Sequence, residues 1–174
     1  MGVTGNMKTL LSHYRLYGSL AVLFGLGLFI FGYVLEFVYY FAPCILCYVQ
    51  RYLFLSTAIF AAPFAFGIVK NKVSIYIFLV ISYLLSLAGL ALSFKHLAIQ
   101  KNPIAASCNA AVQQLLDSHN ILSIFATWLQ GNEECAMVQT WLGINIVYWS
   151  MAGFIIMLAL LIKSGVCFYY RDKN

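Results

Sequence analysis

The chain has 174 residues, of which 63% are hydrophobic and only 9% are charged. Soluble domains carry about 25% charged residues, so the composition excludes an ordinary soluble protein and predicts an integral membrane protein. The net charge of +5 does not indicate nucleic-acid binding, because the basic residues are scattered and their positions fit membrane topology better.

Four apolar stretches are long enough to cross a bilayer as helices, at roughly residues 17–37, 44–69, 73–94 and 144–166. The first stretch is too long for the apolar core of a signal peptide, so we expect it to be retained as a membrane helix. The predicted fold is therefore all-α, with one membrane domain over residues 1–174 built as a bundle of four transmembrane helices.

The third and fourth spans are separated by a long loop, roughly residues 96–143. Within this loop, apolar residues recur at intervals of three and four from Ile121 to Leu129. This periodicity predicts a short amphipathic helix lying on the bilayer surface, and a helix packed against the bundle is the alternative.

The basic residues predict how the chain is oriented. Four spans place both termini on one side, together with the turn that contains Lys70 and Lys72. By the positive-inside rule this side is cytoplasmic, because most of the lysines and arginines gather there. The long loop and the start of the second span then face outward.

Four of the five cysteines fall on the outward side, where disulfides persist. Cys44 and Cys47 form a close pair at the start of the second span, and Cys108 and Cys135 lie in the long loop. Cys167 lies past the last apolar span on the reducing side, and we expect it to be a reduced or buried spectator.

The close pair stands in the segment Pro43–Arg51. On a helix, Cys44, Cys47 and Arg51 would share one side, and Pro43 would suit the first turn. The free N–H groups at a helix start and a nearby guanidinium both favour a thiolate. A charged arginine so near the bilayer is energetically costly, which indicates a functional role. We therefore interpret the cysteine pair as redox-active.

Metal binding is the main chemical alternative for a Cys-x-x-Cys pair. Zinc usually takes four ligands, and His96 with Cys108 or Cys135 could complete a set, but the spacings are long and irregular. We therefore expect no metal centre. A purely structural disulfide between Cys44 and Cys47 would constrain the unfolded chain little, because the loop that it closes is very small.

The loop cysteines could be a structural staple or a second redox pair. Beside an outward-facing Cys-x-x-Cys, the second role becomes more attractive, because two disulfides in one compartment can pass electrons by thiol–disulfide exchange. The membrane position of the close pair suggests a lipid-soluble two-electron acceptor, namely a quinone.

These features together resemble the DsbB family of bacterial disulfide-bond formation proteins. The chain shares the four spans, a Pro-Cys-x-x-Cys motif that opens the second span, and a run Tyr48–Arg51 like the one that follows the family's pair. His96 at the end of the third span and the segment Cys135–Gly143 match as well. One departure is Glu36, which falls where glutamine is common.

The resemblance implies a protein-dithiol:quinone oxidoreductase of the bacterial inner membrane, with its active cysteines on the periplasmic side. Its substrates would be a membrane quinone, ubiquinone or menaquinone, and a periplasmic DsbA-type thioredoxin-fold oxidase. The implied catalytic residues are Cys44, Cys47, Cys108 and Cys135, and the implied quinone-binding residues are Arg51, Cys47 and His96.

The resemblance also implies an order of events. The reduced partner would attack a Cys108–Cys135 disulfide at Cys108, and the freed Cys135 would attack Cys44. Cys47 would leave as a thiolate beside the quinone, with Arg51 holding the charge.

Two alternatives to this function remain open. The first is a quinone-linked thiol oxidoreductase like vitamin K epoxide reductase, although in that family the loop pair precedes the membrane pair in sequence and here it follows. The second is a non-enzymatic membrane assembly subunit whose cysteines are structural or bind metal.

Overall fold

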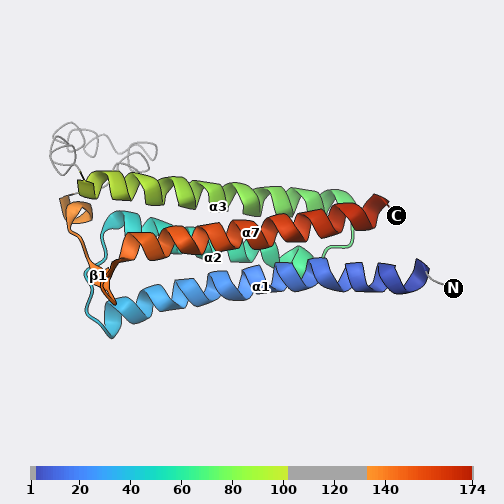
Figure 1. Ribbon diagram of the computed structural model, residues 1–174, viewed down its shortest axis with the longest axis horizontal. Helices are drawn as coiled ribbons and strands as arrows, with labels where there is room; N and C mark the ends of the chain where they lie inside the picture. The colour runs from blue at the N-terminus through green and yellow to red at the C-terminus, as the bar shows by residue number, and fades with distance from the viewer. Residues whose placement is uncertain (1–2, 102–132, 174) are drawn as a thin grey trace, which may run out of the picture.

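The computed structural model describes residues 3–101 and 133–173, which form four long helices and a small hairpin. The long helices are α1 (Val3–Phe37), α2 (Ile45–Ala65), α3 (Lys72–Lys101) and α7 (Ile146–Lys173). α1 packs against α2 and α7, and α3 packs against the same two helices, so the four close into a bundle. Figure 1 shows that α1 begins and α7 ends at the same end of this bundle.

Each long helix contains a stretch that is long and apolar enough to cross a membrane: His13–Phe37, Ile45–Ala65, Lys72–Lys101 and Ile146–Arg171. The prediction of an all-α membrane bundle with four transmembrane helices is thereby confirmed.

The helix ends differ from the predicted spans, and α1 already begins at Val3 rather than near residue 17. α2 ends at Ala65 rather than near residue 69, because Gly67 adopts a positive φ of 69° that an α-helix does not contain. α3 continues through the polar residues near its end to Lys101, so the predicted loop begins later than residue 96. α7 begins at Ile146 and continues past residue 166 into the basic tail.

The middle of the bundle depends on close approach between helices. Phe154 of α7 is fully buried and stacks on Phe54 of α2, with ring centroids 3.8 Å apart. Gly89 of α3 lies so close to the ring of Phe154 that a Cβ there would overlap it. Small residues serve this purpose in membrane bundles, where tight packing replaces the hydrophobic effect between helices.

A two-stranded hairpin precedes α7 at the end of the bundle opposite to the start of α1 (Figure 1). β1 (Thr140–Trp141) and β2 (Ile144–Asn145) are antiparallel, with Trp141 opposite Ile144. The two turn residues, Leu142 and Gly143, have φ values of 53° and 78°. Two positive φ angles are typical of the type I′ turn, whose twist suits a tight hairpin.

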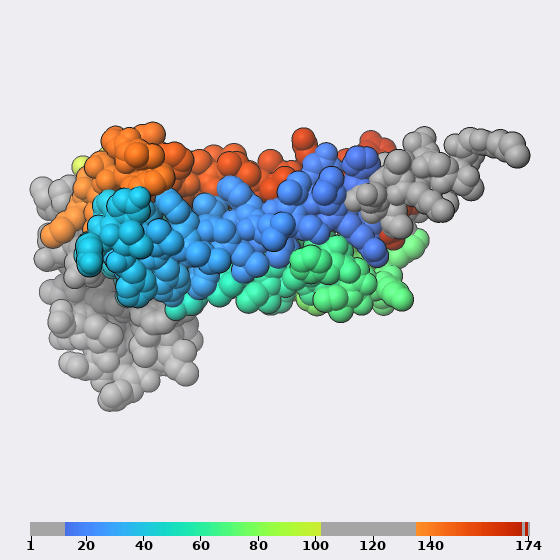
Figure 2. Space-filling view, turned by 90° about the horizontal axis from the view of Figure 1, so that it is seen from below, coloured from blue at the N-terminus to red at the C-terminus, as the bar shows by residue number. Residues whose placement is uncertain are grey.

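Side-chain hydrogen bonds attach this segment to the rest of the bundle. Gln139 Nε2 donates to the carbonyl of Ala42 in the α1–α2 connection, at 2.7 Å, and Asn145 Nδ2 donates to Gln100 Oε1 near the end of α3, at 2.5 Å. Figure 2 shows the orange segment beside the cyan α1–α2 connection. The attachment fixes the place of the helix η1 (Glu133–Ala136), which contains Cys135.

Two predictions about the loop fall outside the described residues. These are the amphipathic helix from Ile121 to Leu129 and the position of Cys108. Both stay predictions.

Candidate functional site

The close cysteine pair lies at the first turn of α2. The helix begins at Ile45, and Cys44 is the N-cap residue, with φ −75° and ψ 168°. Pro43 therefore precedes the cap, so the prediction that it occupies the first turn was wrong. The thiol of Cys44 donates a hydrogen bond to Cys47 Sγ at 3.3 Å. The two sulfur atoms are thus adjacent, and Cys47 is the acceptor of the pair.

Cys44 faces the segment that returns from the long loop. It is buried in a cluster with Leu46, Ile99 and the fully buried Cys135. A hydrogen bond from Cys135 lowers the pKa of the Cys44 thiol, but the hydrogen bond to Cys47 and burial outweigh it and raise that pKa to about 12. Cys44 is therefore held as a neutral thiol in the reduced pair.

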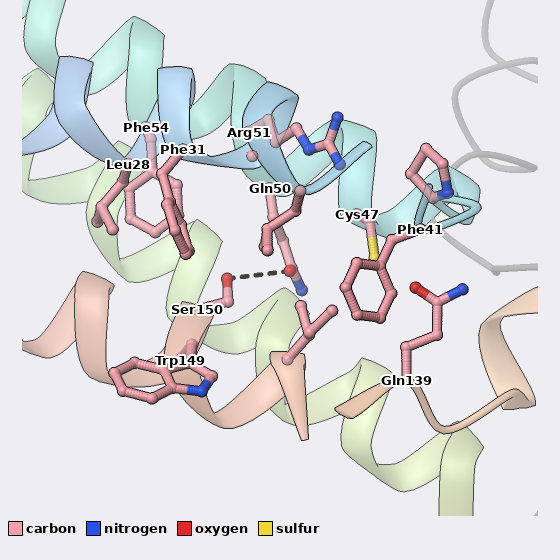
Figure 3. A pocket seen from close by; sticks show the side chains of 14 residues that line it. Leu28, Phe31, Phe41, Cys47, Gln50, Arg51, Phe54, Gln139, Trp149 and Ser150 are labelled. Carbon is pink, nitrogen blue, oxygen red and sulfur yellow. Dashed lines mark hydrogen bonds between the residues drawn. The ribbon is translucent and has the colours of Figure 1, made fainter. Parts of the chain in front are cut away.

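Cys47 faces a different space, which we call the apolar cavity. This cavity encloses about 720 Å³, its open mouth included. Figure 3 shows side chains from α1, α2 and α7 around it. Its aromatic walls are Phe31, Phe41, Phe54 and Trp149, and its polar members are Cys47, Gln50, Arg51, Gln139 and Ser150. Binding sites for small molecules are typically apolar spaces with a few polar groups.

A second, smaller space, which we call the small hollow, lies beside the apolar cavity. Cys44, Cys47 and His96 all line it. His96 is buried, and its Nε2 lies 3.6 Å from Cys44 Sγ. The structure thus places His96 against the buried thiol, in the small hollow rather than in the apolar cavity. Its predicted role in quinone binding stays a prediction.

Arg51 lies at the apolar cavity, and its charge is compensated. Its NH1 forms an ion pair with Glu36 Oε2 of α1 at 2.5 Å, and Tyr48 Oη donates to Glu36 Oε1 at 2.7 Å. The guanidinium also lies over the rings of Tyr33 and Tyr48, 5.4 and 5.3 Å from their centroids. Glu36, whose role the sequence left undecided, is therefore the counter-charge of Arg51.

The structure brings together most of the residues singled out in the sequence. Four of them meet at the start of α2, namely Cys44, Cys47, Cys135 and His96. Arg51 lies one turn further along the same helix. Cys167 is different, because it packs at the edge of the core cluster that contains Tyr14, Phe64 and Phe168. Tyr14 is in the first half of α1, Phe64 near the end of α2 and Phe168 near the end of α7, so Cys167 is remote from the other described cysteines.

Sequence reasoning missed two polar residues of the apolar cavity. Gln50 follows Cys47 by three positions, which places it on the same side of α2, and this spacing was a usable signal. Ser150 donates a hydrogen bond to Gln50 Oε1 at 3.0 Å, drawn in Figure 3. It comes from a helix one hundred residues further along, and local sequence gives no sign of that pairing.

A metal ion is the other species that the sulfur atoms could hold. The sulfurs of Cys44 and Cys47 and a ring nitrogen of His96 all lie within 4.8 Å of one another. Thiolate and imidazole are the ligands that zinc prefers. The geometry is therefore compatible with metal binding as well as with thiol–disulfide exchange.

Comparisons with known proteins show to which family the chain belongs, and this favours thiol–disulfide exchange over metal binding. The sequence profile described as disulfide bond formation protein DsbB matches residues 14–163. Disulfide bond formation protein B of Hahella chejuensis is 31% identical over 133 residues, covering 74% of this chain and 79% of the relative. The protein of the same name from Acinetobacter baumannii is 31% identical over 163 residues, covering 90% and 93%.

A third relative, disulfide bond formation protein B of Chromohalobacter salexigens, is 28% identical over 131 residues, which is 72% of this chain and 74% of the relative. No solved structure matches the chain with significance. The profile covers both the cysteine pair at the start of α2 and the segment that contains Cys135. The chain therefore belongs to the DsbB family of disulfide bond formation proteins, and it is a multi-pass membrane protein.

Proposed function

We propose that this chain is a protein-dithiol:quinone oxidoreductase that reoxidises a DsbA-type thioredoxin-fold oxidase and passes the electrons to a membrane quinone. The observation that carries the proposal is the position of the sulfur pair. Cys44 packs against Cys135 on one side, and Cys47 lines the apolar cavity on the other. A pair in this position can receive electrons from the loop and release them into the cavity.

The first half of the reaction is thiol–disulfide exchange. One thiolate of the reduced partner would attack Cys108 in a Cys108–Cys135 disulfide, which forms a mixed disulfide with Cys108 and releases Cys135. The second thiol of the partner would then displace Cys108, which oxidises the partner and leaves two loop thiols. Cys135 would then attack Cys44 in a Cys44–Cys47 disulfide, and Cys47 would leave as the thiolate. Cys108 would then attack Cys135 in the Cys135–Cys44 mixed disulfide, which re-forms the loop disulfide and releases Cys44 as a thiol. Two electrons thereby pass from the partner to the loop pair and from the loop pair to the Cys44–Cys47 pair.

The position of Cys47 at the start of α2 supports its role as the leaving group. The first turn presents free N–H groups, and a helix start stabilises negative charge on a nearby sulfur. Cys44 donates its S–H to Cys47 and has a pKa raised to about 12. The negative charge of the reduced pair therefore resides on Cys47, next to the cavity.

A quinone fits the apolar cavity. A quinone accepts two electrons and two protons. Reoxidation of the Cys44 thiol and Cys47 thiolate to the disulfide supplies both electrons and the proton of Cys44, and the second proton comes from water. The walls are aromatic, which suits a flat ring, and Glu36 compensates the charge of Arg51, which suits a neutral molecule over an anion. Gln50 also offers an amide N–H that finds no partner among the described residues.

We further propose that the cysteine end of the bundle faces the periplasm of a bacterial inner membrane. Several basic residues lie near the helix ends that are remote from the cysteine pair, namely Arg15, Lys70, Lys72, Arg171 and Lys173. Positive residues favour the cytoplasmic side of a membrane. Labelling of intact cells with a membrane-impermeant maleimide tests this orientation. Cys108 should react after mild reduction, and labelling only in lysed cells would contradict it.

The central test is stoichiometric. The purified protein in lipid discs is mixed anaerobically with a reduced DsbA-type oxidase and a short-chain ubiquinone. One quinone should be reduced for each disulfide formed in the partner, and Cys44→Ser should abolish both. The matched control is Cys167→Ser, which should behave as wild type. Partner oxidation without quinone consumption would contradict the proposal.

Metal binding at Cys44, Cys47 and His96 is the second candidate, because their ligand atoms lie within 4.8 Å of one another. Elemental analysis of the protein purified without chelator separates the two candidates. The oxidoreductase should contain less than stoichiometric zinc and should keep its activity in a chelator. One tightly held ion per chain would favour the assembly-subunit alternative.

A further inference from the structure

The carboxamide of Gln50 is the least satisfied polar group of the apolar cavity. Its side chain is buried, with 4% of the residue exposed, and Nε2 has no hydrogen-bond partner among the described residues. Leaving a buried donor unpaired costs about 1–3 kcal/mol. An apolar side chain of the same size would avoid that cost. The buried amide therefore indicates a function other than stabilising the fold.

The orientation of this amide is fixed from α7. Ser150 Oγ donates to Gln50 Oε1 at 3.0 Å, and Ser93 Oγ lies 3.5 Å from Ser150 Oγ on the far side. Because the oxygen of the amide is engaged with Ser150, the nitrogen is the atom left for another acceptor. Figure 3 shows the carboxamide among the residues that line the cavity, with its oxygen toward Ser150.

The surroundings define the acceptor that this N–H can serve. Gln50 lies three positions after Cys47 on α2, so the two side chains share one side of the helix, about 4.5 Å apart along its axis. The cavity is walled by aromatic rings, and the charge of Arg51 is already matched by Glu36. A neutral oxygen acceptor on a flat ring fits these conditions, whereas a carboxylate or phosphate would find no unpaired cation among the described residues that line the cavity.

We propose that Gln50 Nε2 donates a hydrogen bond to a carbonyl oxygen of the quinone ring and that Ser150 is the positioning residue that holds the amide for it. This inference rests on the proposed function and adds a recognition element to it. A carbonyl oxygen is a stronger acceptor than the phenolic oxygen of a quinol. Gln50 therefore favours the oxidised substrate over the reduced product and assists product release.

The test measures binding without turnover. The protein, with its cysteines oxidised, is titrated with a short-chain ubiquinone, and binding is followed by quenching of tryptophan fluorescence, since Trp149 lines the cavity. Gln50→Leu should raise the Kd for the quinone about tenfold and the Kd for the corresponding quinol less. The Tm of Gln50→Leu without quinone should equal or exceed that of wild type, because a buried unpaired group is removed.

A second variant supplies a readout that a structural role would not change. In Gln50→Glu the side chain can donate only when it is protonated, so its Kd relative to wild type should fall as the pH is lowered. A ratio that does not change with pH would overturn the inference. An unchanged Kd for Gln50→Leu would overturn it too, as would a lowered Tm together with an unchanged preference for quinone over quinol.

The serine provides a matched pair of controls. Ser150→Ala should raise the Kd for the quinone severalfold, because the amide is then free to rotate. Ser82→Ala removes a buried hydroxyl that donates to the carbonyl of Phe78 in its own helix, and it should have no effect. Wild type that fails to bind any quinone would refute the proposed function itself, whereas wild-type binding with normal Gln50 variants refutes only this inference.

Discussion

Glu36 of α1 and Arg51 of α2 form an ion pair at the apolar cavity, with side-chain exposures of 18% and 11%. Tyr48 donates a second hydrogen bond to the same carboxylate. The cation that was expected to act alone beside Cys47 is therefore one member of a paired group. A buried pair is costly to break from one side only, because the remaining charge is left without a partner.

The first prediction follows from this pairing. Arg51→Gln should lower the free energy of unfolding by about 3 kcal/mol, because Glu36 is then left uncompensated. Glu36→Gln in the same chain should restore most of that loss. The measurement is a double-mutant cycle of thermal or denaturant unfolding in detergent. A loss in the double variant equal to the sum of the two single losses would show that the two charges are not coupled.

Arg51→Ala separates the two halves of the proposed reaction. We expect a higher KM for quinone and slower reoxidation of the Cys44–Cys47 pair, while exchange between the partner oxidase and the loop cysteines continues at the wild-type rate. Exchange is measured alone by omitting quinone and trapping the first turnover with acid. Unchanged turnover at low quinone concentration would remove Arg51 from the acceptor site.

Gly32 gives a way to move the guanidinium without removing it. A Cβ at Gly32 would lie 2.7 Å from Arg51 Nε and 2.9 Å from Arg51 Cδ. Gly32→Ala should therefore displace Arg51 and raise the KM for quinone severalfold. Gly27→Ala is the matched control on the same helix, because a Cβ there meets nothing within 4 Å. Identical quinone kinetics in the two variants would show that the position of Arg51 does not matter.

The sequence predicted the fold well because a bilayer permits few solutions. Apolar stretches that must cross it have to be helices, and their number and approximate places follow from length and composition. The ends were less predictable. α3 runs through Lys95 and His96 to Lys101, because a helix can continue into the interface wherever its polar side chains still find partners or water.

The site was predictable along a helix and not between helices. The spacing of Cys47 and Arg51 correctly gave their common side of α2, where both line the apolar cavity. Cys44 does not share that side, because it is the N-cap residue and packs against Cys135. No local signal places Ser150 against Gln50, or Cys135 against Cys44, because those contacts depend on how α7 and the hairpin segment pack. The pairing of Glu36 with Arg51 is of the same kind.

The pH dependence of alkylation tests the electrostatics of the pair. The pKa of Cys44 is raised to about 12, so only a small fraction is thiolate at neutral pH, and that fraction grows roughly tenfold per pH unit below the pKa. Alkylation of Cys44 by iodoacetamide in the reduced protein should thus keep rising beyond pH 9. Cys47→Ala removes a hydrogen bond that raises the pKa, so the rise should shift to lower pH. Mass spectrometry of the Cys44 peptide gives both curves, and coincident curves would contradict the assignment.

The hairpin attachment controls how Cys135 meets Cys44. In a chain that keeps only these two cysteines, a disulfide should form between them under mild oxidation, because both are buried in one cluster. Asn145→Ala removes the hydrogen bond to Gln100 and should slow that disulfide roughly tenfold, since small displacements of reacting groups are costly. Leu142→Asn is the control: it suits the positive φ of the turn and should leave the rate unchanged. Equal rates in both variants would mean that the start of α2, and not the hairpin, places Cys135.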